Sequence, residues 1–171
     1  VPLSWRNVYC GLFRAVSKKK KLQYYFIDNE YYFYRDGCYG HYDDGERFAF
    51  YSKAILESLQ YLDWYPDVIH ANDWQTALVP VFLRAHCMKM AKYQPIKTLF
   101  TIHNMEYQGR FPDEFVDEVL GLPEDWKPTM HFDTCCNLMK AAIHTSDRVS
   151  TVSRTYSFEI QDPYYAHGLH D

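Results

Sequence analysis

Phe100-Thr-Ile-His103-Asn104-Met-Glu-Tyr107-Gln108-Gly109 is the stretch around which the rest of the chain is organised. The run that leads into it, from Pro95 to Ile102, is short, apolar and rich in β-branched residues, which is typical of a buried strand. The run ends at His103 and Asn104, whose side chains both donate and accept hydrogen bonds. Because ligands of open α/β sheets bind at the carboxyl ends of the strands, these two side chains are candidates for a site.

A second stretch, from Pro66 to Trp74, has the same form. It passes from a proline through a short apolar strand, residues 66–70, into polar residues, and a helical pattern follows. Two such units in succession place His70, Asp73, His103 and Asn104 along one edge of a sheet. Each pair by itself is equally consistent with capping of a strand or a helix, whereas the two pairs together favour a site.

The elements after residue 45 alternate between helix and strand. Helices are predicted from Glu46 to Leu62, Gln75 to Ala91, Leu138 to Thr145 and Ser153 to Ile160, and strands over residues 66–70, 96–102 and 148–152; residues 5–16 and 22–27 are also strand-like. This order predicts an α/β fold, with a Rossmann-like parallel sheet, helices on both faces and right-handed crossovers. The length fits a single domain, 1–171. The long connection from Gly109 to Asn137 is expected to contain one short helix, from Asp113 to Leu120.

The composition is that of a globular protein and limits the partners. The chain has 171 residues, is 47% hydrophobic and carries a net charge of −4, which argues against nucleic acid or an anionic membrane as a partner. No apolar run approaches the length of a membrane span, and no signal peptide opens the chain. The five cysteines lack CxxC spacing, so we expect reduced thiols in a cytoplasmic protein.

Several kinds of chemistry lack their motifs. The chain has no GxGxxG or GxxxxGK[ST] phosphate loop, no HExxH zinc motif and no GxSxG nucleophile turn. The adjacent Cys135 and Cys136 are interpreted as packing residues. A divalent metal site made of His70, Asp73 and His103 stays open as a less favoured alternative.

A polar cluster of His, Asn and Asp without metal or nucleophile suits binding of a polyhydroxylated ligand. The chain is also rich in tyrosine, whose ring stacks on sugars.

Five segments resemble the bacterial glycogen synthases and starch synthases. Residues 70–78, HANDWQTAL, resemble their HAHDWHxAL segment, and residues 100–109 resemble FTxHNLxYQG. The other three are residues 25–33, similar to FIDNExYF, residues 39–50, similar to YGYxDDxERFxFF, and residues 137–160, similar to NFMKxGI followed by ADxxxTVSxTYxxEI. The resemblance covers nearly the whole chain, and its first two motifs are specific when both are present.

The resemblance implies a GT-B architecture, in which two Rossmann-like domains face each other across a cleft. It also implies transfer of glucose, with retention, from a nucleotide sugar such as ADP-glucose to the non-reducing end of an α-1,4-glucan, without a metal or other cofactor. His103 inherits the catalytic position beside the donor glucose. The substrate-binding positions that the resemblance implies are those of Asp73, Asn104, Trp74, Tyr107, Gln108 and His70.

The chain departs from the family pattern in ways that make it look incomplete. The glycine-rich KTGGLxDV loop and the carboxy-terminal domain are absent, so the chain resembles part of an amino-terminal catalytic domain that is inactive alone. Asn72 and Gln75 stand where histidine is common, and Ala141-Ala142 replace glycines. Besides the metal-dependent hydrolase, a stand-alone glucan-binding module and a purely structural α/β domain stay open as alternatives.

Overall fold

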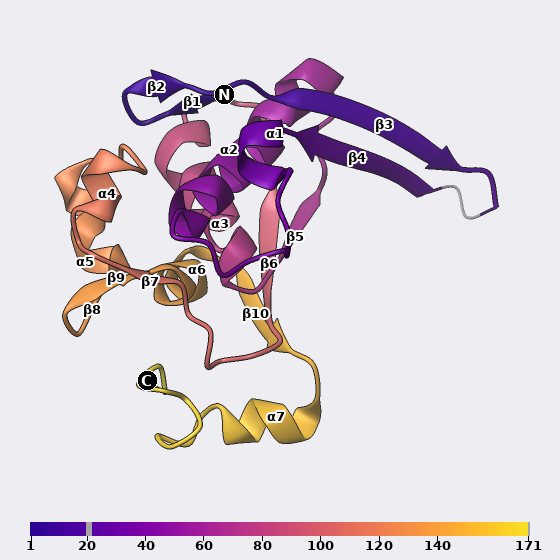
Figure 1. The fold of residues 1–171 in the computed structure, drawn as a ribbon. Helices are drawn as coiled ribbons and strands as arrows, with labels where there is room; N and C mark the ends of the chain where they lie inside the picture. The colour runs from indigo at the N-terminus through magenta and orange to yellow at the C-terminus, as the bar shows by residue number, and fades with distance from the viewer. Residues whose placement is uncertain (20–21, 171) are drawn as a thin grey trace.

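A three-stranded parallel sheet lies at the centre of the protein, which we describe from a computed structural model covering residues 1–19 and 22–170. Its strands are β5 (Val68–Asn72), β6 (Lys97–Ile102) and β10 (Arg148–Thr151), in the order β5-β6-β10. Ala71 and Val149 both pair with Phe100 in the central strand. The parallel sheet and its connecting helices confirm the predicted α/β fold (Figure 1), although among the described residues the two crossover helices cover one face and not both.

Three helices pack together beside this sheet. They are α2 (Asp44–Leu62), α3 (Leu78–Phe82) and α6 (Leu138–Thr145). The crossovers from β5 to β6 and from β6 to β10 run in the same direction, so two right-handed crossovers place α3 and α6 on the same face. Ala71 and Phe100 are buried on that face, while Val68, His70 and Asn72, which alternate with Ala71 along β5, are exposed on the other. None of the described helices is long and apolar enough to cross a membrane.

The helix predicted from Gln75 to Ala91 is divided and ends early. The chain forms a 3₁₀ turn, η1 (Trp74–Thr76), then α3, then a π-helical turn, η2 (Leu83–Cys87). Pro80 lies in the first turn of α3, where its missing amide is tolerated. Beyond Cys87 the chain leaves the helix because the buried Tyr93 turns inward and donates its hydroxyl hydrogen to the carbonyl of Leu56, at 2.8 Å.

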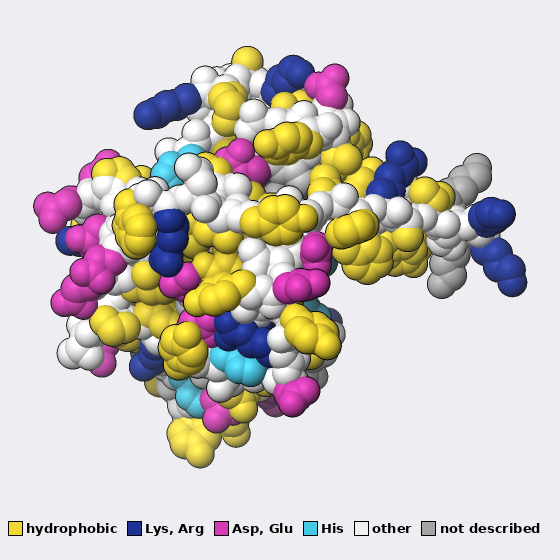
Figure 2. Space-filling view, turned by 45° about the horizontal axis from the view of Figure 1, so that its top comes forward, with side chains coloured by type: hydrophobic (Ala, Val, Ile, Leu, Met, Phe, Trp, Pro, Cys, Tyr) yellow, Lys and Arg dark blue, Asp and Glu magenta, His cyan; other side chains and the backbone are white. Residues whose placement is uncertain are grey.

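Two antiparallel hairpins precede α2. The segment 5–16, predicted as strand-like, is split between one strand of the first hairpin and one strand of the second. The first pairs β1 (Pro2–Leu3) with β2 (Arg6–Asn7), and the second pairs β3 (Gly11–Ser17) with β4 (Leu22–Asp28). A short helix, α1 (Glu30–Phe33), follows. The second hairpin projects from the body of the molecule, and hydrophobic side chains gather along it (Figure 2). Phe13 and Phe26, which pair across it, are each more than half exposed.

The connection from Gly109 to Asn137 is more structured than predicted. Its helix is shorter, α4 (Phe115–Glu118), and η3 (Glu124–Trp126) and α5 (Lys127–Met130) follow. A small antiparallel sheet closes the connection, with β7 (Arg110–Phe111) and β8 (His131–Phe132) on either side of β9 (Cys135–Asn137). Strands of two or three residues are too short to show an alternating pattern, so no sequence pattern predicts them.

The last two helices begin where the sequence predicts. Asn137 caps α6 by accepting a hydrogen bond from the amide of Lys140, and Ser153 caps α7 (Arg154–Glu159) by accepting one from the amide of Tyr156. In both cases a short polar side chain satisfies an amide that has no partner within its helix. Figure 1 shows α7 beneath the carboxyl end of β10.

The carboxylate of Asp147 joins β10 to β6 and η2. Its Oδ2 accepts from the amide of Thr98 at 2.9 Å, from the hydroxyl of Thr98 at 3.0 Å and from Nη2 of Arg84 at 2.7 Å. Burial raises the pKa of this carboxyl, but the hydrogen bonds from Thr98 and the charge of Arg84 outweigh burial and bring the pKa to about 2. The folded structure therefore stabilises the ionised form of Asp147.

We expect Asp147→Ala to lower the free energy of unfolding by about 2 kcal/mol at pH 7, because charge-assisted hydrogen bonds are lost. The folded pKa lies below the ordinary value of 3.8, so the contribution is complete above that value and disappears as the pH falls toward 2. Urea unfolding from pH 7 down to pH 2 measures both effects. The control is Asp125→Ala, which removes an exposed carboxylate from η3. An equal loss in both variants, or a difference that does not shrink with pH, would contradict this role of Asp147.

Candidate functional site

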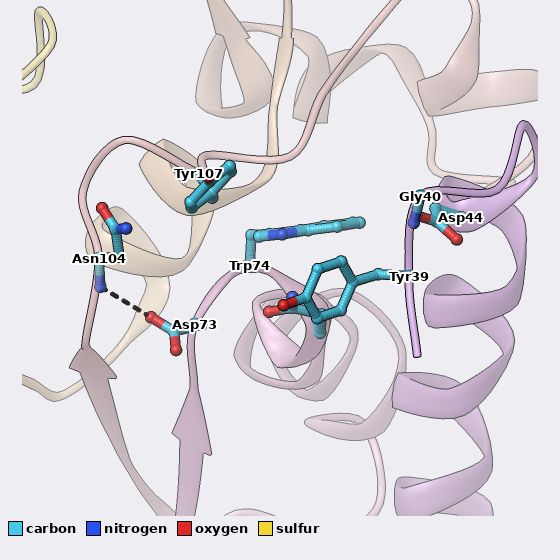
Figure 3. Close-up of a pocket in the computed structure, with 8 residues that line it drawn as sticks. Tyr39, Gly40, Asp44, Asp73, Trp74, Asn104 and Tyr107 are labelled. Carbon is cyan, nitrogen blue, oxygen red and sulfur yellow. Dashed lines mark hydrogen bonds between the residues drawn. The ribbon is translucent and has the colours of Figure 1, made fainter. Parts of the chain in front are cut away.

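The carboxyl ends of β5 and β6 come together through one aspartate. Asp73 directly follows β5, and its Oδ1 accepts from the backbone amide of His103 at 2.8 Å and from that of Asn104 at 3.4 Å (Figure 3). His103 and Asn104 directly follow β6, the neighbouring parallel strand. The structure thus brings together the two polar segments that the sequence places at strand ends.

Asp73 holds this position in a backbone conformation that side chains rarely adopt. Its φ is 55° and its ψ is 179°, a region used almost entirely by glycine. Such a conformation costs about 1–3 kcal/mol and persists only where the surroundings impose it. Here the amide of Asp73 donates to the carbonyl of Thr101 at 3.0 Å, and its carboxylate accepts from the loop after β6. Backbone strain held in this way at the end of a strand is a mark of functional sites.

The imidazole of His103 is exposed and oriented by Asn72. Its Nε2 lies 2.9 Å from Oδ1 of Asn72, the last residue of β5. Because a carbonyl oxygen only accepts, Nε2 is the donor, and in the neutral ring Nδ1 is left as an acceptor. Asn72, one of the departures from the family pattern, thus supports the orientation of His103.

A cavity of about 520 Å³ opens at this edge of the sheet. It is lined by Tyr39, Gly40, Asp44, Asp73, Trp74, Gln75, Asn104 and Tyr107. In Figure 3 the indole of Trp74 lies between the rings of Tyr107 and Tyr39. Oδ1 of Asn104 accepts from the amide of Glu106 at 2.9 Å, which leaves its side-chain amide group free to donate. The cavity therefore combines flat aromatic faces with hydrogen-bonding groups, as sugar-binding sites do.

Close packing fixes the indole of Trp74 in the cavity wall. Its ring meets that of Phe48 edge to face, with centroids 5.1 Å apart. Gly109 lies against the other part of the ring, where an added Cβ would come within 2.7 Å of it. The φ of Gly109 is also +66°, which disfavours any other residue. Glycine is thus required at position 109 by both the backbone conformation and the close approach of Trp74.

A buried ion pair holds the loop that carries Tyr39. Oδ1 of Asp44 accepts from Nε of Arg47 at 2.9 Å, and Oδ2 accepts from the amide of Gly40 at 2.6 Å. The guanidinium of Arg47 also donates to the carbonyls of Tyr32 and Cys38. Arg47 is only 2% exposed, so this charge is desolvated and fully paired, and the loop cannot move without unpairing it.

Three predicted site residues do not line this cavity. His103, the predicted catalytic residue, is one of them, and its ring contacts Asn72. His70 lies inside β5, and not past its end, so its side chain is on the exposed face of the sheet with Nε2 2.6 Å from Oγ1 of Thr101. Gln108 is buried, and its Oε1 accepts from Arg110 at 2.7 Å and from Asn137 at 2.7 Å. The strand-end pattern groups His70 with the site and the resemblance groups Gln108 with it, but strand length and the direction of the loop separate these two residues from the cavity.

The metal alternative lacks a set of ligands. Among residues 1–19 and 22–170 no three His, Cys, Asp or Glu side chains lie where they could hold an ion together. The imidazole of His70 instead contacts Thr101, and that of His103 contacts Asn72. The structure therefore does not favour a metal-dependent hydrolase.

Sequence reasoning about strand ends missed several residues of the site, and Tyr39, Asp44 and Asn72 are three of them. Tyr39 and Asp44 come from the loop before α2 and the first turn of α2, far from either strand end along the chain. Asn72 is the third, because the strand was predicted to stop at residue 70. The segment from Tyr39 to Phe50 had been singled out only by its resemblance to a family motif.

Comparison with known proteins agrees with this architecture. The family model of the starch synthase catalytic domain matches residues 1–171. The chain is 53% identical to a glycogen synthase of Desulfitobacterium hafniense and 46% identical to one of Caldicellulosiruptor bescii; each match covers 99% of this chain, and 37% and 36% of the two relatives. A solved structure, the catalytic domain of starch synthase IV from Arabidopsis thaliana bound to ADP and acarbose, superposes with a TM-score of 0.82 at 30% identity, over 98% of this chain and 36% of that one.

The chain thus spans a little over a third of the length of the relatives it matches. The match to the family model nevertheless runs from the first residue to the last. Together with the strand-end site and the fold, this shows that the chain belongs to the family of starch synthase catalytic domains.

Proposed function

We propose that the protein of which this chain is a part transfers glucose from ADP-glucose to the non-reducing end of an α-1,4-glucan, with retention of configuration. The observation that carries the proposal is the cavity at the carboxyl edge of the sheet, where Asp73, Trp74, Asn104 and Tyr107 converge beside His103. The names of the relatives and the ADP and acarbose bound to the Arabidopsis domain support it. The chain itself contributes part of an amino-terminal catalytic domain.

The aromatic side chains of the cavity hold the sugars. Tyr107 is 61% exposed and Tyr39 is 68% exposed, so each offers an open ring face for stacking on a glucose unit. Trp74, fixed by Gly109 and Phe48, provides a rigid wall between them. A site built from fixed rings binds a sugar chain with little loss of its own conformational freedom.

His103 and its neighbours orient the donor glucose at the reacting carbon. The ring of His103 is held by Asn72 and its amide by Asp73, so its position is set before the substrate binds. The free amide group of Asn104 donates to a sugar hydroxyl, and Asp73 keeps both segments in place. Preorganised dipoles of this kind act most strongly on charge that develops during the reaction.

The departing diphosphate needs positive charge that this cavity does not supply. None of the eight described residues that line it is a lysine or an arginine. We therefore assign this task to a carboxy-terminal domain of the same polypeptide, facing the cavity across a cleft. No metal or other cofactor takes part in the proposed reaction.

The first prediction concerns transfer itself, measured as glucose incorporated from ADP-glucose into glycogen. We expect no turnover by the 171-residue chain and robust turnover by the full-length protein. In the full-length protein His103→Ala should lower kcat about 100-fold or more while changing glucan affinity little, because the lost group acts near the developing charge.

The matched control for that assay is His144→Ala, which removes an exposed histidine from α6. It should leave kcat within about twofold. Robust transfer by the chain alone, or a His103→Ala enzyme that works as well as the control, would show the roles to be assigned wrongly.

A second prediction separates sugar binding from catalysis. Tyr107→Ala should weaken binding of maltoheptaose to the full-length protein about five- to tenfold, since a stacked ring contributes about 1–1.5 kcal/mol. Titration calorimetry without donor measures it. Tyr61→Ala removes a still more exposed ring near the end of α2, which does not line the cavity, and should have no effect. Equal losses in both variants would contradict a sugar-binding role for the cavity.

Tight glucan binding without any transfer by the full-length protein would instead favour a glucan-binding module.

A further inference from the structure

A second cavity, of about 390 Å³, lies apart from the first and shares no lining residue with it. Its walls come from the turn between β1 and β2, from the middle of α2, from η2 and from the segment after α4. It is lined by Pro2, Leu3, Ser4, Trp5, Lys53, His86, Leu120 and Gly121. The wall is tightly packed where two of its segments meet, since an added Cβ at Gly121 would lie 2.8 Å from Cα of Ser4.

Lys53 brings a buried positive charge to this cavity. The residue is 8% exposed, and its ammonium forms no hydrogen bond or ion pair with any residue in the described part of the chain. Its Nζ lies 5.2 Å from the centre of the Phe82 ring, a favourable cation–π contact. Burial lowers the pKa of this lysine, as expected for an ammonium without a counter-charge. A buried and unpaired cation is costly, and a bound anion would offset that cost.

His86 adds a second nitrogen donor to the same wall. Its ring stacks on Phe82, the same ring that Lys53 contacts, with centroids 5.6 Å apart. Burial, and then the charge of Lys53, bring the pKa of His86 to about 4, so the ring is neutral near pH 7 and one of its nitrogens carries a proton to donate. No described residue forms a hydrogen bond with this ring.

The groups around these two side chains leave the cavity electropositive. Glu57, one turn along α2 from Lys53, acts on the ammonium from a distance but does not line the cavity. The thiol of Cys87 is neutral, because burial raises its pKa to about 11. Lys89 adds a further positive charge near His86. No carboxylate is among the residues that line the cavity.

We propose that this cavity binds the phosphate group of a small metabolite, with Lys53 and His86 as its ligands. A phosphate offers several acceptor oxygens to the three ammonium hydrogens and to the imidazole, and it carries more charge than a carboxylate. The volume exceeds what a phosphate alone requires, and the exposed ring of Trp5 provides a flat surface for the organic part. The site is independent of the sugar cavity and of the reaction proposed there.

The test uses inorganic phosphate as the probe and titration calorimetry at constant ionic strength with the 171-residue chain. Lys53→Met keeps the length and apolar stem of the side chain, removes an unpaired buried charge and should fold at least as well as the original. We expect it to weaken phosphate binding at least tenfold. Lys18→Met makes the same change in net charge at an exposed position of the hairpin and should change the affinity less than twofold.

Two further measurements distinguish the site from a merely structural lysine. Phosphate should raise the pKa of His86 in a proton NMR titration of the original chain, and should not do so in Lys53→Met. Methyl phosphate should bind about as well as inorganic phosphate, as a metabolite site requires, whereas a site for free phosphate alone would exclude it.

The proposal is overturned if phosphate binds equally to the original chain and to Lys53→Met, or to neither. Exclusion of methyl phosphate would also overturn it. The same titration on the full-length protein gives a last outcome: binding by the chain but not by the longer protein would mean that a carboxylate of another segment is the natural partner of Lys53.

Discussion

The hydrogen bond from the amide of His103 to the carboxylate of Asp73 is the contact on which the site depends. It links the ends of two neighbouring parallel strands and thereby fixes the distance between the two polar segments. Asp73 makes it from a strained backbone, with φ at 55°. Such strain lasts only where several interactions impose it, and here the pairing of β5 with β6 supplies them. The sheet thus stabilises a conformation that the isolated segment would not adopt.

Segments far apart in sequence complete the cavity around that contact. The indole of Trp74 is fixed by close packing against Gly109. The loop that carries Tyr39 is held because the carboxylate of the Asp44–Arg47 ion pair accepts a hydrogen bond from its backbone. Arg47 is almost wholly buried, so opening the loop would leave a charge without a partner. The walls of the cavity formed by Trp74 and by the Tyr39 loop are therefore fixed before any ligand binds, which suits the proposed orientation of sugars for transfer.

Two cavities of the chain differ in the charge of the residues around them. The sugar cavity is lined by carboxylates and neutral groups, whereas the cavity of Lys53 and His86 is electropositive. In the two proposals, a phosphate-bearing ligand is therefore favoured away from the strand ends, and the diphosphate of the nucleotide sugar meets positive charge from another domain. Under the proposed function, this separation is the physical reason to expect no transfer by the chain alone.

Much of the fold and part of the site follow from local signals in the sequence. The apolar run before His103 predicts β6, the stripe from Phe48 to Leu62 predicts α2, and Asn137 and Ser153 predict where α6 and α7 begin. These signals depend on periodicity and on caps, which a few neighbouring residues determine by themselves. The polar residues past each strand, Asp73 and His103 among them, are found in the same way.

Only the tertiary structure decided which side chains share a cavity. It placed His70 on the face of the sheet and Gln108 in the interior, and it brought Tyr39 and Asp44 to the strand ends. It also placed Lys53 and His86 in contact with the same ring, that of Phe82. These outcomes depend on the packing of α2 and η2 and on the turn of the loop after β6. Contacts between residues distant along the chain leave no periodic trace in the sequence, so only the folded chain shows them.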